Sequence, residues 1–256
     1  MNVMGLLDKM PLWGVFVASI VITVLSIELG RRMGQRRREK STGEKELQVG
    51  PFVAATLSLL AFMLAMTFNT VESRFNELKH VVLDEANALG TVYLRADLLP
   101  ETDRAEVRQL LHDYAALRVE AVDSGQAEQV ERAIERSQEL HGVLWSRATA
   151  LAEQRPTPTS ALFVQSVNEL IDLHQTRITL GLRYRLPGVI WAVLMGLVVL
   201  AMAMGGFATG LSDSPRLVVI TVSAALAFSV VLMLAVSLDR PYHHISGVTR
   251  AALPNL

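Results

Sequence analysis

The chain has 256 residues, of which 51% are hydrophobic and 19% are charged, and its formal net charge is -1. This balance requires apolar and charged residues to be separated along the chain, and the near-neutral charge gives no reason to expect a nucleic-acid partner. The sequence contains no cysteine, which excludes disulfides, thiolate catalysis and cysteine-based zinc sites.

Four apolar stretches are long enough to cross a lipid bilayer. They cover residues 12–29, 52–71, 186–210 and 217–238. About 20 mostly apolar residues span a hydrocarbon core about 30 Å thick. Buried helices of a large soluble protein are the alternative, but four runs of this length, each flanked by charge, favour transmembrane helices. We therefore expect a multi-pass membrane protein, with the lipid bilayer as one of its partners.

The segment between the first two apolar stretches is strongly basic. Its basic residues are Arg31, Arg32, Arg36, Arg37, Arg38, Lys40 and Lys45. The positive-inside rule places this basic loop, residues 31–45, in the cytoplasm. The helical domain that follows the second stretch is then extracytoplasmic, although basic residues near the membrane ends of that domain favour the opposite orientation. We expect the protein to be located in the cell membrane, and specifically in a bacterial inner membrane.

The residues between the second and third stretches are predicted to form helices. Apolar residues recur at helical spacing over residues 71–92 and extend the second membrane helix. Three more amphipathic helices follow, separated by turn signals at Pro100, Gly125 and Pro156. An even number of antiparallel helices returns the chain to the membrane face it left. The expected fold class is an all-α membrane protein with four transmembrane helices and an antiparallel helical bundle inserted between helices two and three. The expected domains are residues 1–71, 72–185 and 186–256, the last ending in a short tail.

The sequence carries no recognisable catalytic motif. It has neither a nucleophile elbow nor a glycine loop for phosphate. Each predicted bundle helix has one histidine: His80, His112, His141 and His174. Folding the helices back to back spreads these histidines over about 15 Å, too far for one metal site. We expect no enzyme activity, cofactor or metal, and we interpret the histidines as interfacial or surface residues.

Polar residues lie close to the apolar stripe on the first and last bundle helices. The candidates are Glu85, Asn87, Arg95, Asn168, Glu169 and Asp172. Because partly buried polar groups need partners, we expect these side chains to pair with one another. A structural network that fixes the bundle is the favoured interpretation, and a ligand site is the alternative.

Three blocks of sequence are distinctive: LAFMLAMTFNTVESRFNELKHVVLDEANALGTVYLRADLLP, VNELIDLHQTRITLGLRYRLPG and SLDRP. They resemble the bestrophin-like membrane family, a domain of unknown function, and the resemblance extends from the basic loop to Pro241. It implies a distant relation to bestrophins, which are pentameric anion channels with a second transmembrane helix that lines an apolar neck. Counting helical turns back from Arg74 makes Phe62, Met66 and Asn69 the pore-lining candidates, since apolar constrictions can pass weakly hydrated anions.

Two functions remain open on these grounds. The first is a homo-oligomeric anion channel or transport protein for chloride or another small anion. The second is a membrane-anchored sensory or scaffolding module without transport activity. The resemblance also implies a cytosolic location for the residues after the second membrane helix, which is opposite to the charge-based orientation that we prefer.

Overall fold

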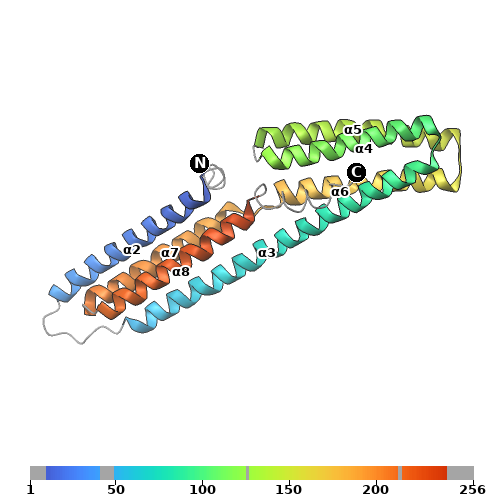
Figure 1. Cartoon of the computed structure of the whole chain (residues 1–256). Helices are drawn as coiled ribbons and strands as arrows, with labels where there is room; N and C mark the ends of the chain where they lie inside the picture. Colours follow the sequence, from blue (N-terminus) through green and yellow to red (C-terminus); the bar gives the residue numbers. More distant parts are fainter. Residues whose placement is uncertain (1–9, 41–48, 125–126, 213–214, 241–256) are drawn as a thin grey trace. The chain divides into compact units, whose positions relative to one another are not determined.

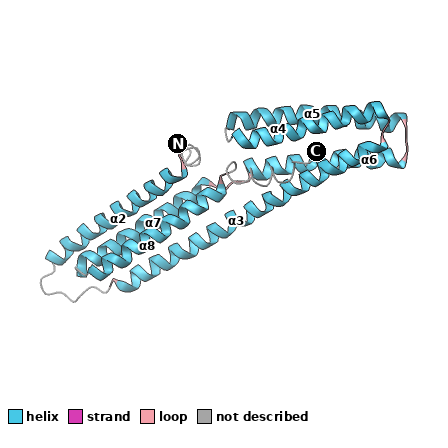
Figure 2. Cartoon of the chain, viewed as in Figure 1, coloured by secondary structure: helices cyan, strands magenta, loops and turns pink. Residues whose placement is uncertain are grey.

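The computed structural model describes residues 10–40, 49–124, 127–212 and 215–240 (Figure 1). Within these ranges the chain is helical and has no strand (Figure 2). Four helices are long and apolar enough to cross a membrane. They are α2 (Leu12–Lys40), α3 (Gly50–Arg95), α7 (Gly188–Ser212) and α8 (Pro215–Asp239). The prediction of an all-α protein with four membrane-spanning helices is confirmed at this level.

Helix α2 is longer than its apolar stretch. Residues 31–40, expected in a loop, continue the helix, whereas the rest of the predicted basic loop, including Lys45, lies outside the described residues. Glu28 supports the extension because it pairs with Arg31 at 3.0 Å and with Arg32 at 2.8 Å, one turn along the helix. Arg37, Arg38 and Lys40 in the last turn also suit the negative end of the helix dipole.

The described chain divides into two compact units. We call the first the membrane unit; it contains residues up to Ser73 and Leu186–Arg240. We call the second the helical unit; it contains Arg74–Arg185. Residues of α3 belong to both units, and the predicted tail beyond Arg240 lies outside the described residues.

In the membrane unit, α2 packs closely against α7 through glycines. Gly30 and Gly34 lie on α2, and Gly206 and Gly210 lie on α7. A Cβ atom on Gly30 would collide with the carbonyl oxygen of Ala203, and one on Gly206 would collide with that of Ile27. Small residues permit such close approach, which drives helix association in lipid through van der Waals contact.

Buried polar residues at the end of α8 hold the same unit together. Asp239 Oδ1 accepts a hydrogen bond from the Leu186 backbone N–H at 3.4 Å. Arg240 Nη2 donates to the Met10 carbonyl oxygen at 2.6 Å. Asp239 and Arg240 therefore tie the end of α8 to the segments that precede α2 and α7.

The helical unit has one hydrophobic core. The helical unit consists of the last part of α3, η1 (Ala96–Leu98), α4 (Glu101–Ser124), α5 (Ala127–Gln154), α6 (Pro158–Ile178) and the short π-helix η2 (Thr179–Arg183). Each α-helix contributes fully buried side chains, among them Val92, Leu111, Ala148 and Phe163. The antiparallel pair α4 and α5 lies side by side in Figure 1.

Local sequence signals begin and end these helices. Pro158 occupies the first turn of α6, and Thr157 forms a reciprocal capping box with Ser160, so the first free N–H groups are satisfied. At the other end, the guanidinium of Arg74 donates to the carbonyl oxygens of Leu180 and Gly181, each at 3.2 Å. These contacts satisfy carbonyl groups in the π-helical segment, where the regular α-helical pattern is interrupted.

Candidate functional site

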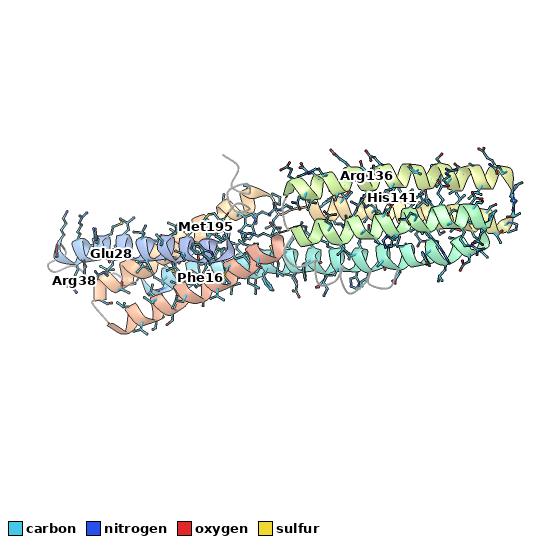
Figure 3. The ribbon with its side chains drawn as sticks, turned by 45° about the horizontal axis from the view of Figure 1, so that its top comes forward. Phe16, Glu28, Arg38, Arg136, His141 and Met195 are labelled. Atoms are coloured by element: carbon cyan, nitrogen blue, oxygen red, sulfur yellow. The ribbon has the colours of Figure 1, made fainter. Side chains whose placement is uncertain are left out.

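A group of polar side chains lies inside the core of the helical unit, and we call it the buried polar cluster. Its members are Glu85 from α3, Tyr114 and Arg118 from α4, His141 from α5, and His174 and Arg177 from α6. Figure 3 labels His141 among the side chains of this unit. Because every long helix of the unit contributes at least one member, the cluster depends on the packing of all four.

The Glu85 carboxylate is at the centre of the contacts. Tyr114 Oη donates a hydrogen bond to Glu85 Oε1, and Arg177 Nε lies 2.6 Å from Oε2. His174 Nδ1 and Arg118 Nε lie 3.5 Å and 3.9 Å from Oε1. A carboxylate removed from water needs such compensation, because an unpaired buried charge costs several kcal/mol.

Three rings pack beside this carboxylate. The His141 ring centroid lies 4.6 Å from that of Tyr114 and 4.7 Å from that of His174, with the two imidazoles perpendicular. His174 Nδ1 lies 3.0 Å from Tyr114 Oη. Among the described residues, neither ring nitrogen of His141 has a hydrogen-bond partner. His141 therefore behaves as a packed aromatic ring that makes no polar contact.

Burial decides the protonation of two of these rings. Burial, followed by the proximity of His174, lowers the pKa of His141 to about 4, and the opposing effect of Glu85 is smaller. Burial and then the Glu85 charge raise the pKa of Tyr114 well above its usual value. At neutral pH the His141 imidazole is thus uncharged, and the Tyr114 phenol keeps the proton that it donates to Glu85.

The chemistry of the cluster is that of a charge-compensated core. In the described ranges, no group of three His, Asp or Glu side chains is placed to hold a metal ion. Arg177, and Arg118 at a longer distance, compensate the carboxylate, and the neutral His141 packs against Tyr114 and His174 as an unprotonated base. The arrangement can respond to protons, since charging His141 would add a positive charge beside His174 in a buried site.

The six predicted polar residues differ in their burial and in their hydrogen-bond partners. Of the six candidates, Glu85 belongs to the buried polar cluster, whereas Asn87, Asn168, Glu169 and Asp172 are exposed. Asn168 Nδ2 donates to Asp172 Oδ2 at 2.8 Å, and Arg95 Nη1 donates to the Leu162 carbonyl oxygen at 2.6 Å. The structure thus brings Asn168 and Asp172 together, and it gives Glu85 partners from outside the predicted set.

The prediction for the histidines was half right. His80 and His112 are exposed, as expected, but His141 and His174 are buried neighbours. The expectation that all four are interfacial or surface residues is therefore wrong for this pair. A signal was present in the sequence: His141 lies three residues before Leu144, and His174 lies four after Leu170, so both fall on buried apolar stripes.

The pore-lining candidates lie on a face of α3 that the membrane unit leaves uncovered. The buried positions of this segment form one stripe: Leu60, Leu64, Thr67 and Val71. Phe62, Met66 and Asn69 share another face because they are four and three residues apart. Phe62 and Met66 are 65% and 59% exposed, and Asn69 is also exposed. This face is available to lipid or to another copy of the chain.

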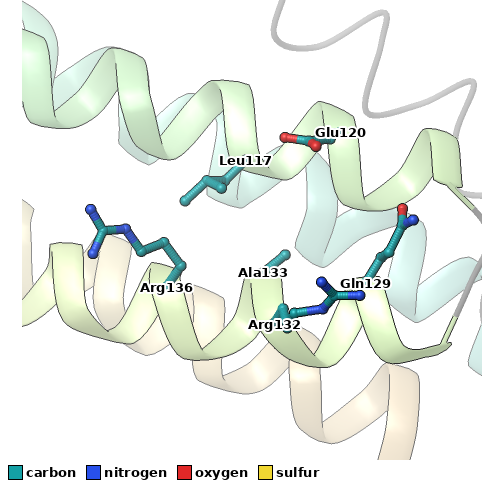
Figure 4. A pocket seen from close by; sticks show the side chains of 6 residues that line it. All are labelled: Leu117, Glu120, Gln129, Arg132, Ala133 and Arg136. Atoms are coloured by element: carbon teal, nitrogen blue, oxygen red, sulfur yellow. The ribbon is translucent and has the colours of Figure 1, made fainter.

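A surface groove lies between α4 and α5 in the helical unit (Figure 4). Its volume is about 310 Å³, and it is lined by Leu117, Glu120, Gln129, Arg132, Ala133 and Arg136. Both arginines are paired, Arg132 with Glu128 at 3.3 Å and Arg136 with Glu139 at 2.5 Å. Because these charges are already balanced, the groove does not present a concentrated positive site for an anion.

Known proteins share this fold and sequence pattern. The model of a family described as the Bestrophin-like domain matches residues 17–253. A bacterial bestrophin homolog from Klebsiella pneumoniae has a TM-score of 0.70 and 16% identity, over 94% of this chain and 95% of that one. A crystal structure of a membrane protein has a TM-score of 0.71 and 15% identity, over 95% and 96%. No protein of curated function matches the sequence. The chain belongs to the bestrophin-like family of membrane proteins.

Proposed function

We propose that the protein is a homo-oligomeric anion channel in which α3 lines the pore. The exposed face of α3 that carries Phe62, Met66 and Asn69 is the observation that supports this function most directly. The bestrophin-like family supports it as well, because bestrophins form anion-conducting rings around their second transmembrane helix. In such a ring, Phe62 and Met66 form an apolar constriction that passes weakly hydrated anions and gates by dewetting.

The proposal includes an arrangement in the membrane. Residues 72–185 form an antiparallel four-helix bundle outside the bilayer, between the second and third membrane helices. Residues 31–45 face the cytoplasm of a bacterial inner membrane, because their positive charge favours that side. Chloride or another small anion is the transported species, and the lipid bilayer and further copies of the chain are the partners.

Anion flux in liposomes tests the channel. Purified wild-type protein should form a ring of subunits in detergent and conduct chloride after reconstitution. Phe62→Ala and Met66→Ala should increase the flux severalfold, because removing bulky apolar side chains widens the constriction and lowers the dewetting barrier. Phe52→Ala is the matched control, since Phe52 has the same 65% exposure on α3 but lies ten residues, about 15 Å, nearer the start of the helix than Phe62. A monomer or dimer that is silent in this assay would refute the channel.

Labelling of introduced cysteines tests the orientation. The chain has no cysteine, so Ser41→Cys and Ser124→Cys each create one reactive thiol. An impermeant reagent added to intact cells should label Ser124→Cys and leave Ser41→Cys unmodified. The opposite pattern would indicate that this chain has the orientation of bestrophins, with the residues after the second membrane helix in the cytosol.

The buried polar cluster favours a second candidate, a sensory or scaffolding module. Its contacts join all the long helices of the helical unit, so a change of charge there would alter the packing of each. Such a module would act through a partner protein and would conduct no ions. A full-length protein that is silent in liposomes but is captured by a specific partner in the same membrane would favour this candidate.

A further inference from the structure

One face of α2 changes along its length from apolar to basic. Its exposed apolar residues are Val17, Val21, Leu25 and Leu29, and its exposed basic residues are Arg32, Arg36 and Lys40. Successive members are three or four residues apart, so all seven lie on one side of the helix. We call this the α2 outer face.

The opposite side of α2 is covered by its own unit. Its buried residues are Val15, Ser19, Thr23, Ser26, Gly30 and Gly34. At the basic end, a Cβ atom on Gly34 would collide with the Phe207 carbonyl oxygen of α7. Since α7 packs on the glycine side, the α2 outer face points away from it and is free to meet a partner from the bilayer.

The length of α2 places the basic residues at the membrane surface. Its 29 residues correspond to about 43 Å at 1.5 Å per residue, which exceeds the hydrocarbon core of about 30 Å. With the apolar part of the face among the acyl chains, Arg32 and the residues beyond it reach the headgroup region. Figure 3 labels Glu28 and Arg38, which mark this basic end.

The charge of this end is complementary to phosphate. Residues 28–40 contain six basic and two acidic side chains, which leaves a net charge of +4. One acid, Glu28, is held by Arg31 and Arg32. Clusters of four to eight basic residues next to a membrane helix attract anionic lipids, and arginine forms strong hydrogen bonds with phosphate oxygens.

We propose that the α2 outer face binds anionic phospholipids, with the headgroup phosphate at Arg32, Arg36 and Lys40 and the acyl chains along Val17–Leu29. The occupant must be apolar at one end and anionic at the other, because the face has both parts in one continuous stripe. A nucleic acid or an acidic peptide would satisfy only the basic part. This site is independent of whether the protein conducts ions.

Fluorescence quenching by brominated lipids tests the proposal on the full chain. Leu29→Cys, in a chain without other cysteines, carries a fluorophore at the junction of the two parts. In vesicles that mix phosphatidylcholine and phosphatidylglycerol, brominated phosphatidylglycerol should quench this fluorophore with a relative association constant at least fivefold above that of brominated phosphatidylcholine. High salt should reduce the difference. Equal quenching by the two lipids would overturn the proposal.

Charge variants locate the effect. Arg32→Gln, Arg36→Gln and Lys40→Gln combined should bring the relative association constant to about 1, because these three residues supply the positive charge of the α2 outer face. Arg32→Lys with Arg36→Lys should retain most of the preference. Arg132→Gln, Arg136→Gln and Arg147→Gln remove equal charge from exposed positions of the helical unit and should leave it unchanged. The proposal fails if this control triple loses the preference equally, or if the Gln triple at α2 keeps it.

Discussion

His141 makes the stability of the helical unit depend on pH, with a sign and size that follow from its burial. In the folded state its pKa is about 4, against an ordinary value of 6.5. The unfolded state therefore binds more protons between these values. The contribution of neutral His141 to the free energy of unfolding is fully present above pH 6.5, decreases as the pH falls, and is lost below about pH 4. At one pKa unit per 1.36 kcal/mol, the full loss is about 3 kcal/mol, of which about 2 kcal/mol is reached at pH 5.

The groups that face His141 do not remove this effect. They are Tyr114 on α4, His174 on α6 and Glu85 on α3. The Glu85 carboxylate favours the charged imidazole, but its effect on the His141 pKa is smaller than those of burial and His174. His141→Phe keeps a ring beside Tyr114 and His174 and removes the titration. Because His141 has no hydrogen-bond partner among the described residues, this change breaks no polar contact.

Amide hydrogen exchange of full-length protein in detergent measures the difference. In the wild type, the opening free energy of α5 amides should fall by about 2 kcal/mol between pH 7.5 and pH 5, after correction for intrinsic exchange. In His141→Phe that decrease should be small. His112→Phe is the control, because His112 is exposed, and it should behave like the wild type. An equal pH dependence in wild type and His141→Phe would refute the reasoning.

Two further changes test the packing of each unit. Gly206→Ala should destabilise the full chain by about 1–3 kcal/mol in thermal unfolding, because the new Cβ would collide with the α2 backbone. Gly196→Ala, which has open space, should be neutral, and equal effects would contradict the close packing. Glu85→Gln should cost about 3–5 kcal/mol, because Arg177 loses its buried partner. Asp172→Asn, at an exposed position, should change the unfolding free energy by less than about 0.5 kcal/mol, and a similar loss in both variants would count against the buried pair.

Local signals in the sequence placed the breaks between the helices of the helical unit. Pro100 predicted the break before α4, which begins at Glu101, and Pro156 predicted the break between α5 and α6. Such signals act through backbone geometry over a few residues, so no knowledge of packing is needed. The extension of α2 was missed because a basic run was interpreted as a loop, although Glu28 and Arg32 are spaced for a helical ion pair.

The buried polar cluster could be predicted only in part. Glu85 was selected because it lies beside an apolar stripe, but its partners lie 29 and 92 residues away, at Tyr114 and Arg177. Such contacts depend on the height and rotation of each helix relative to the others, and a period of 3.6 residues does not determine either. The burial of His141 and His174 could have been predicted from their stripes, but their contact could not, because an estimate from helix lengths cannot resolve two rings 4.7 Å apart.

The charge balance of the buried polar cluster explains why a histidine is tolerated there without a hydrogen bond. The cluster holds one carboxylate, Glu85, and two guanidinium groups, those of Arg118 and Arg177. An extra proton on His141 would place a charge next to His174 in a buried medium that screens charge poorly, whereas the neutral ring costs only its desolvation. Among these groups, Glu85 is the one that favours the charged imidazole. Glu85→Gln should therefore also lower the pH at which His141 becomes charged, which NMR titration of the His141 ring would detect in folded protein.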